Sequence, residues 1–325
     1  MRAAEKRVPA HEPVAYAMRA GMVESVHYGS VVVLDGDGAE LLAVGDADAA
    51  YYPRSTVKPV QGTAMVRSGL DLPDELLALA VASHSGEPRH IEGVSRLLAE
   101  HGLDESELRN TPSLPAGQQA RRDWLAAGGY AARLPQNCSG KHAAMLATAK
   151  LLGQPRDGYL DPDHPVQRAI ARTLEELAGE PIAHVAVDGC GAPLFALSLR
   201  GVTRAIGRIA AAGADTPEGR VAAAMRTHPE MVGGSGRAVS ELLGAPPGLL
   251  AKDGAEGTYV AACPDGTAVG VKIADGGDRS RVAVTAAALA MAGVPRATLA
   301  EVDGACPVTA GDLALAGELA AYWQA

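Results

Sequence analysis

The stretch Arg54-Ser55-Thr56-Val57-Lys58-Pro59 places a serine three residues before a lysine and a proline directly after that lysine. Proline is favoured in the first turn of a helix, and the apolar spacing stays helical through Met65. Residues three apart on a helix face the same side, so we expect the amine of Lys58 to reach the hydroxyl of Ser55. A neutral lysine can activate a serine as a nucleophile. The stretch therefore predicts a catalytic serine–lysine pair, against the alternative of a chance spacing.

Lysine is scarce in the chain, which has 23 arginines and six lysines. Arginine stays protonated, whereas a buried lysine can lose its proton and act as a base or a ligand. Lowering a lysine pKa to about 7–8 costs about 4 kcal/mol of differential solvation. Two other lysines stand in unusual company, in Asn137-Cys138-Ser139-Gly140-Lys141-His142 and Ala251-Lys252-Asp253-Gly254. These contexts indicate chemistry more than a solvated surface.

Strand patterns lie near both ends of the chain. Residues 30–34 and 39–44 flank Asp35-Gly36-Asp37-Gly38, which predicts a β-hairpin with an Asp-Gly turn. A second hairpin is expected over 257–262 and 268–274, followed by a strand that runs into a helix over 281–291.

Helical spacing fills the middle of the chain. The segments with helical spacing are 74–82, 90–101, 143–152, 165–178, 197–212 and 218–226. We therefore predict an α+β fold in which the N- and C-terminal segments share one antiparallel sheet covered by a helical region. The whole chain, 1–325, is expected to form a single domain, with the sheet in 20–72 and 250–295 and the helical part in 73–249.

The overall charge bounds the choice of partners. A net charge of −9 and a pI near 5.5 argue against nucleic acid or an anionic membrane as the main partner. No apolar leader is visible in residues 1–13, and no segment approaches the ~18 apolar residues of a spanning helix. We expect a cytoplasmic protein, whose four cysteines would stay reduced.

Two cysteines lie near glycines, and one of them is close in sequence to a lysine. Cys138 precedes Lys141 by three residues, and Cys190 follows in Asp188-Gly189-Cys190-Gly191. Two thiolates with a lysine could hold zinc, although His142 would be the conventional third ligand. The alternative is a pair of packed thiols.

A further polar cluster, Ser83-His84-Ser85, follows the apolar run that ends at Ala82. Polar residues at the end of a buried element form either a site or a helix cap. Lys252-Asp253-Gly254 resembles the Lys-Ser/Thr-Gly element of serine β-lactamases, with an Asp in place of Ser or Thr.

Taken together, the motifs from about residue 23 to 294 resemble the L-asparaginase II family, the rhizobial-type asparaginases. The motifs are Arg54-Ser55-x-x-Lys58-Pro59, Ala82-Ser83-His84-Ser85, Asn137-Cys138-Ser139-Gly140-Lys141-His142, Asp161-x-x-His164-Pro165, Asp188-Gly189-Cys190, His228-Pro229-Glu230-Met231-Val232 and Lys272-x-x-Asp275-Gly276. The resemblance implies a fold similar to serine β-lactamases and glutaminases, a homodimer, and hydrolysis of L-asparagine to L-aspartate and ammonia.

The resemblance also implies roles for single residues. Two serine–lysine pairs carry over to Ser55 with Lys58 and to Ser83 with Lys252. A zinc site carries over to Cys138, Lys141 and Cys190. The residues expected to bind substrate are Arg54, His142, Asp188 and Gly254, with Asp188 taking the substrate α-ammonium group. Two other functions stay open, a β-lactamase-like or other small-amide hydrolase and a non-catalytic protein that binds zinc or an amino acid.

Overall fold

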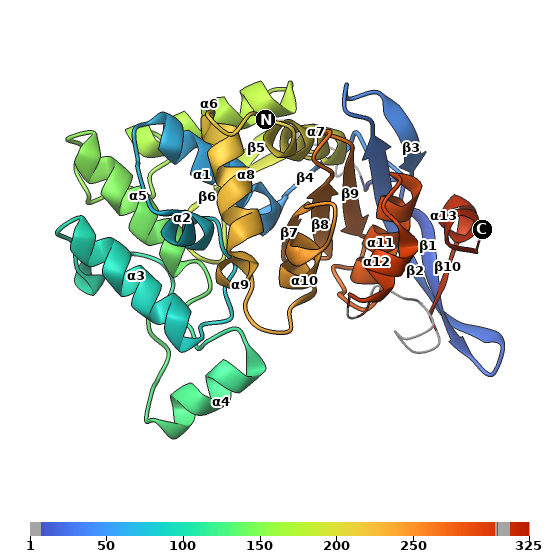
Figure 1. The fold of residues 1–325 in the computed structure, drawn as a ribbon, viewed down its shortest axis with the longest axis horizontal. Coiled ribbons are helices and arrows are strands. Elements are labelled where there is room, and N and C mark those ends of the chain that lie inside the picture. The colour runs from blue at the N-terminus through green and yellow to red at the C-terminus, as the bar shows by residue number, and fades with distance from the viewer. Residues whose placement is uncertain (1–7, 303, 305–312, 325) are drawn as a thin grey trace, which may run out of the picture.

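The computed structural model describes residues 8–302, 304 and 313–324, and Figure 1 shows a sheet on one side of a helical body. The strands of this sheet are β1 (Glu12–Arg19), β2 (Met22–Leu34), β3 (Glu40–Val44), β7 (Leu250–Asp253), β8 (Thr258–Ala262), β9 (Ala268–Ile273) and β10 (Leu313–Leu315). They run in the order β10-β1-β2-β9-β8-β7, with β3 paired to β2. All of these pairs are antiparallel. The predicted α+β class and the sheet shared by both ends of the chain are confirmed, but β1 and β10 lie outside the predicted sheet segments 20–72 and 250–295.

Helices on both faces bury the centre of this sheet. Both α7 (Leu199–Ala210) and α11 (Arg281–Met291) contact β2, β8 and β9, and Figure 1 shows them on opposite sides of the sheet. The edge strand β7 is covered by η1 (Arg54–Val57), a 3₁₀ turn, and by two helices of the body. All four residues of β7 are therefore buried, including Lys252 and Asp253.

The helical body comes from the middle of the chain. Its helices are α1 (Lys58–Arg67), α2 (Asp74–Ala80), α3 (Pro88–Glu100), η2 (Glu105–Glu107), α4 (Gln118–Ala126), α5 (Ser139–Leu151), α6 (Pro165–Ala178), α8 (Pro217–Thr227), α9 (Pro229–Val232) and α10 (Ala238–Gly244). Near the C-terminus follow α12 (Arg296–Ala300) and α13 (Gly317–Gln324). Each of the six predicted helical segments coincides with a helix, and five of them do so within a few residues at both ends.

Two predicted segments need correction. Residues 197 and 198 end the strand β6 (Pro193–Ser198), which joins β4 (Ala50–Tyr51) and β5 (His184–Val187) in a small second sheet that the sequence patterns missed. The hydroxyl of Ser198 caps α7 by accepting the N–H of Gly201, so the helix begins only at Leu199. The predicted strand at the start of 281–291 is wrong, because that whole segment is α11.

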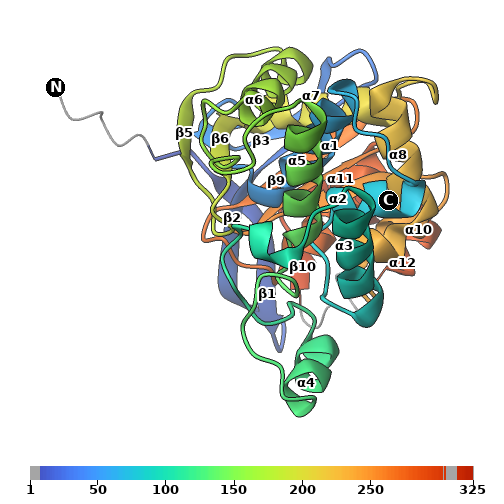
Figure 2. The same ribbon diagram turned by 90° about the vertical axis from the view of Figure 1, so that its left-hand side faces the viewer.

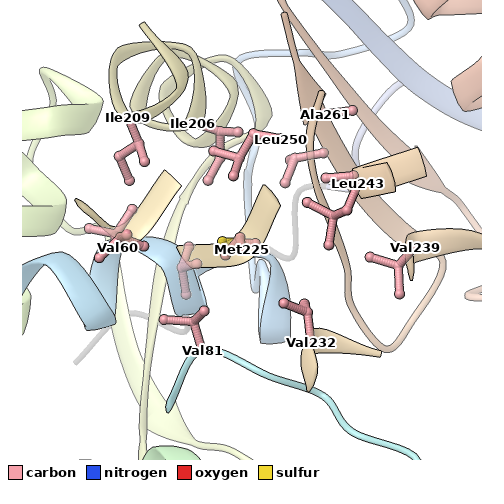
Figure 3. Close-up of a cluster of buried hydrophobic side chains, with 14 of the residues drawn as sticks. Val60, Val81, Ile206, Ile209, Met225, Val232, Val239, Leu243, Leu250 and Ala261 are labelled. Carbon is pink, nitrogen blue, oxygen red and sulfur yellow. The ribbon is translucent and has the colours of Figure 1, made fainter. Parts of the chain in front are cut away.

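One apolar cluster joins the body to the sheet, and Figure 3 shows side chains from several elements pointing toward one another within it. Val60 of α1, Ile206 of α7 and Met225 of α8 lie there beside Leu250 of β7. Burying an aliphatic side chain of this size contributes about 1.5–3 kcal/mol. The cluster thus holds β7, which carries Lys252, and α1, which carries Lys58, in one packed core.

The helix α4 stands apart from this body. Figures 1 and 2 both show it extending away from the other helices, and none of its residues is buried. Among the described residues, no helix has the length and apolar character required to cross a bilayer.

Candidate active site

Segments far apart in sequence line a polar cavity of about 390 Å³ at the junction of body and sheet. Its wall includes Arg54, Ser55, Ser83, Asn137, Cys138, Asp188, Cys190, Arg237, Asp253, Gly254, Glu256 and Arg281. Most of the residues predicted from sequence therefore meet at one place.

Two lysine amines converge on one serine at the base of this cavity. The Nζ of Lys58 lies 3.1 Å from the Oγ of Ser83, and the Nζ of Lys252 lies 2.9 Å from the same oxygen. Lys58 also donates to the carbonyl of Ala82. Both lysines are 1% exposed, and Ser83 is 5% exposed. The arrangement is a continuous, almost dry chain of hydrogen bonds along which protons can move.

Ser55 occupies a different position from the one predicted. Among the described residues, its side chain has no hydrogen-bond partner, and Lys58 reaches Ser83 instead of Ser55. Ser55 and Lys58 are nevertheless joined by the η1 turn, in which residues three apart lie above one another. Ser55 is half-buried on the cavity wall, so its hydroxyl is free to meet a substrate.

Burial changes the protonation of Lys252. Desolvation lowers the pKa of Lys252 to about 8, although the adjacent carboxylate of Asp253 acts in the opposite direction. Asp253 lies 2.6 Å from the Lys252 amine and 2.6 Å from Arg237. Burial would raise the pKa of Asp253, but the two cations outweigh it and hold that pKa far below its usual range. Lys252 is therefore a group that exchanges its proton near neutral pH.

The rim of the cavity carries opposed charges on a strained backbone. Arg54 donates to Asp188 at 2.7 Å and lies 3.6 Å from Glu256. The φ angles of Arg54 (54°) and Glu256 (60°) are both in the left-handed region. Such a conformation costs on the order of 1–3 kcal/mol and commonly marks functional positions.

Gly254 has no room for a side chain. A Cβ at this position would lie 2.2 Å from the Oγ1 of Thr258 and 3.0 Å from the carbonyl of Pro53. The glycine thus lets the end of β7 approach the chain just before Ser55, where it forms part of the cavity wall.

A second lysine cluster adjoins the first. The Nζ of Lys141 lies 3.3 Å from the Sγ of Cys190, and Cys138 lies 3.1 Å from Lys58. A hydrogen bond from Cys138, aided by Lys141, lowers the pKa of Cys190 to about 5. The same hydrogen bond together with burial raises the pKa of Cys138 to about 12. Burial would lower the pKa of Lys141, but the two sulfurs raise it overall.

These donors fit a small thiophilic cation. Tetrahedral zinc at ~2.3 Å from sulfur and ~2.0–2.1 Å from nitrogen sets its ligands about 3.5 Å apart, close to the Lys141–Cys190 separation of 3.3 Å. Within the described residues, no three His, Cys, Asp or Glu side chains are grouped to hold a metal. A zinc site here would therefore need the Lys141 amine.

His142 is not brought to the cavity. It is fully buried on α5, and its Nδ1 lies 2.8 Å from the hydroxyl of Tyr159. Burial and then the Lys141 charge lower the pKa of His142 well below its usual value. The side chain therefore lies in the core, next to Tyr159, and is not among the residues that line the cavity.

The cavity residues that the sequence analysis missed include Arg237, Glu256 and Arg281. Arg281 donates to the carbonyl of Gly254 at 2.6 Å. Glu256 could have been found from its place two residues after Gly254. Arg237 carried no signal, because nothing in its local sequence connects it to Asp253.

Comparisons with known proteins give structural relatives of low similarity. A search of curated proteins found no match. A structure from Bacteroides dorei, provisionally assigned as a β-lactamase, has 15% identity and a TM-score of 0.42, covering 75% of this chain and 84% of its own. The native form of Mglu has 17% identity and a TM-score of 0.41, covering 78% of this chain and 61% of its own. A β-lactamase from Burkholderia vietnamiensis has 14% identity and a TM-score of 0.36, covering 82% and 92%. These values are too low to transfer an activity.

The sequence itself matches a family model over nearly its whole length. The model is that of L-asparaginase II, and it matches residues 15–316. The match includes every residue named in the cavity and in both lysine clusters. The chain belongs to the L-asparaginase II family.

Proposed function

We propose that this protein hydrolyses the side-chain amide of L-asparagine to L-aspartate and ammonia through an acyl-enzyme on Ser55. Its family makes it a hydrolase that acts on a small-molecule amide. The observation that carries the proposal is the hydrogen-bonded chain Lys58–Ser83–Lys252 beneath a cavity whose wall includes Ser55. A hydrolase of this kind needs a nucleophile and two proton-transfer groups within one site.

The polar groups at the cavity rim suit an amino-acid substrate. L-Asparagine carries an α-ammonium and an α-carboxylate group that need partners of opposite charge. Asp188 is assigned to the ammonium, and Arg54 to the carboxylate. Because these two side chains now pair with each other at 2.7 Å, substrate would exchange one ion pair for two.

The acylation step begins at Ser55. Its Oγ attacks the amide carbon while the amine of Lys58 accepts its proton, which requires Ser55 and Lys58 to approach when substrate binds. The C–N bond then breaks, and the departing nitrogen receives a proton from Ser83, which is replenished from the ammonium form of Lys252. Ammonia leaves, and an aspartyl ester remains on Ser55.

Deacylation reverses these roles. Lys58 returns its proton through Ser83 to Lys252 along contacts of 3.1 and 2.9 Å. A water molecule then loses a proton to the regenerated amine of Lys58 and attacks the ester carbon. The ester C–O bond breaks, Ser55 regains its proton, and aspartate is released.

The proposed zinc ligands are Cys138, Lys141 and Cys190, which adjoin Asp188. When bound, zinc would supply a fixed positive charge that helps to position substrate. The residues themselves act here by holding Asp188, whose pKa is kept low by Lys141 and Arg54 against the effect of burial. We also propose that the protein forms a homodimer, which light scattering would measure.

The test is ammonia release from asparagine, glutamine and small amides, with Ser55→Ala and Ser83→Ala beside the parent. We expect Ser55→Ala to abolish turnover and any covalent adduct. Ser83→Ala should slow turnover by ~10²–10⁴-fold. Ser68→Ala is the matched control, because that serine caps α1 far from the lysines.

Three outcomes would contradict the proposal. Residual activity and a trapped adduct in Ser55→Ala would make Ser83 the nucleophile. Turnover of nitrocefin without turnover of asparagine would favour the β-lactamase-like alternative. Tight binding of asparagine without ammonia release would favour a non-catalytic binding protein.

A further inference from the structure

The amine of Lys252 has three close contacts, and two of them come from one residue. It donates to the carbonyl oxygen of Asp253 at 2.7 Å and to its carboxylate Oδ1 at 2.6 Å. The third contact is the hydroxyl of Ser83 at 2.9 Å. Successive side chains of a strand normally point to opposite faces. The contact between the side chains of Lys252 and Asp253 therefore depends on β7 ending at Asp253.

The chemistry of these three contacts fixes the direction of the amine. The backbone carbonyl oxygen and the Oδ1 of Asp253 can only accept hydrogen bonds, so each of them binds one N–H of Lys252. The remaining position on the nitrogen then faces Ser83. In the ammonium form this position is a third N–H, and in the neutral form it is the lone pair. Any proton that Lys252 gains or loses at this position therefore moves along the line to Ser83.

Asp253 is itself held from a loop of the helical body. The second carboxylate oxygen of Asp253, Oδ2, accepts a hydrogen bond from Arg237 at 2.6 Å. Only 7% of Asp253 is exposed. Arg237 directly precedes α10, and its side chain also lines the cavity. The other titratable groups that act on Lys252 and Asp253 or are affected by them are Lys58 of α1, Arg281 of α11 and Tyr259 of β8.

We propose that Asp253, held by Arg237, is a positioning residue that aims the amine of Lys252 at Ser83 and sets its protonation. The role in turnover rests on the proposed function, whereas the coupling between the charges does not. Neither Asp253 nor Arg237 needs to touch substrate for this role.

The signs of the two couplings are opposite. Asp253 places a negative charge beside Lys252 and favours the ammonium form, whereas Arg237 places a positive charge nearby and disfavours it. Asp253→Asn should therefore let Lys252 lose its proton at lower pH. Arg237→Gln should make it keep its proton to higher pH. A role in packing alone would give no such pair of opposed shifts.

The experiment follows Lys252 directly and then through turnover. With only six lysines in the chain, ¹³C-labelled lysine gives a simple NMR spectrum, and Lys252→Arg identifies the Lys252 signal. The midpoint of that signal should fall by about one pH unit in Asp253→Asn and rise in Arg237→Gln. Arg237→Lys keeps the charge and should move the midpoint back toward the parent value.

The rate of ammonia release should follow the same shifts. The limb of the kcat profile that reports Lys252 should move down in Asp253→Asn and up in Arg237→Gln, whether Lys252 acts as acid or base. An NMR midpoint that does not move in either variant overturns the inference. NMR midpoints that move while the kcat profile stays fixed overturn the positioning role. A parent protein that releases no ammonia overturns the proposed function instead, and the NMR titration still decides the coupling.

Discussion

Lys252 and Lys141 are the same residue type at almost the same burial, and their environments move their pKa values in opposite directions. Lys252 is 1% exposed and Lys141 is 2% exposed. At Lys252 desolvation prevails and lowers the pKa to about 8. At Lys141 the cysteine sulfurs outweigh desolvation and raise the pKa. Burial alone therefore does not make a lysine a base, because the partners decide whether its charge is compensated.

The difference separates two kinds of chemistry within one cavity. Lys252 faces a hydroxyl and exchanges its proton near pH 8, which suits proton transfer. Lys141 faces a thiolate and keeps its proton in the metal-free state, which makes an ion pair. Lys58 contacts both clusters, through Ser83 at 3.1 Å and Cys138 at 3.1 Å.

The largest effect should come from Lys252→Arg. Arginine retains the positive charge but cannot give up its proton near neutral pH. We expect kcat for asparagine to fall by ~10²–10⁴-fold with the fold intact. Steady-state kinetics and circular dichroism measure both. A variant with near-parental kcat would show that the site needs only the charge, and the contrast with Lys141 would collapse.

Part of this contrast was accessible from sequence. The scarcity of lysine and the motifs around Lys58, Lys141 and Lys252 correctly selected the three lysines that are buried in the described part of the chain. Both hairpins and the helical middle also followed from residue spacing, because local periodicity reports which face of an element is buried. The main sheet could be inferred because the strand patterns occurred only near the two ends of the chain.

The pairings within the site were not accessible from sequence. Three-residue spacing joins Ser55 to Lys58, yet Lys58 turns toward Ser83 of another segment. That choice depends on how α1 packs against the residues after α2, which no local pattern encodes. The sequence showed that Asp253 replaces the Ser or Thr of the related element. It did not show that Arg237 is the partner of Asp253, because no local pattern links the two positions. Side-chain partners therefore had to come from the tertiary structure.

The second effect concerns the thiolate cluster and zinc. In the metal-free state Cys190 is a thiolate, whereas Cys138 and Lys141 hold protons. Zinc bound by two thiolates and a neutral amine must release two protons, so its affinity should fall about 100-fold for each unit of decreasing pH. Calorimetry in buffers of different ionisation heat, with metal analysis, measures this.

Matched cysteine variants provide the control for zinc. Cys190→Ser should lose the metal, whereas Cys263→Ser should retain it, because Cys263 is buried outside the cavity. Zinc content that is unaffected by Cys190→Ser would reduce the cluster to two packed thiols and a hydrogen-bonded lysine. Affinity that does not depend on pH would mean that the Lys141 amine is not a ligand.

A third effect involves the histidine beside each cluster. Burial, aided by nearby charges that include Lys58 for His84 and Lys141 for His142, lowers the pKa of both histidines well below the ordinary histidine value of about 6.5. Each histidine stays neutral in the folded protein but binds a proton in the unfolded chain below that pH. Stability should thus be complete above pH 6.5 and fall by about 1 kcal/mol per histidine near pH 5.5. Urea unfolding at pH 7.5, 6.5 and 5.5 measures the fall, and a flat profile would contradict it.

The smallest effect should come from a lysine outside both clusters. Lys150 lies in the last turn of α5, is exposed, and donates to the carbonyls of His101 and Gly102 at 2.7 and 3.0 Å. Water can replace these hydrogen bonds, so Lys150→Gln should cost less than about 1 kcal/mol and leave kcat and zinc content unchanged. Thermal unfolding, ammonia release and metal analysis of this variant check all three. A large loss of kcat here would mean that lysine substitutions act through net charge or folding, and the distinct roles of Lys252 and Lys141 would no longer follow from their partners.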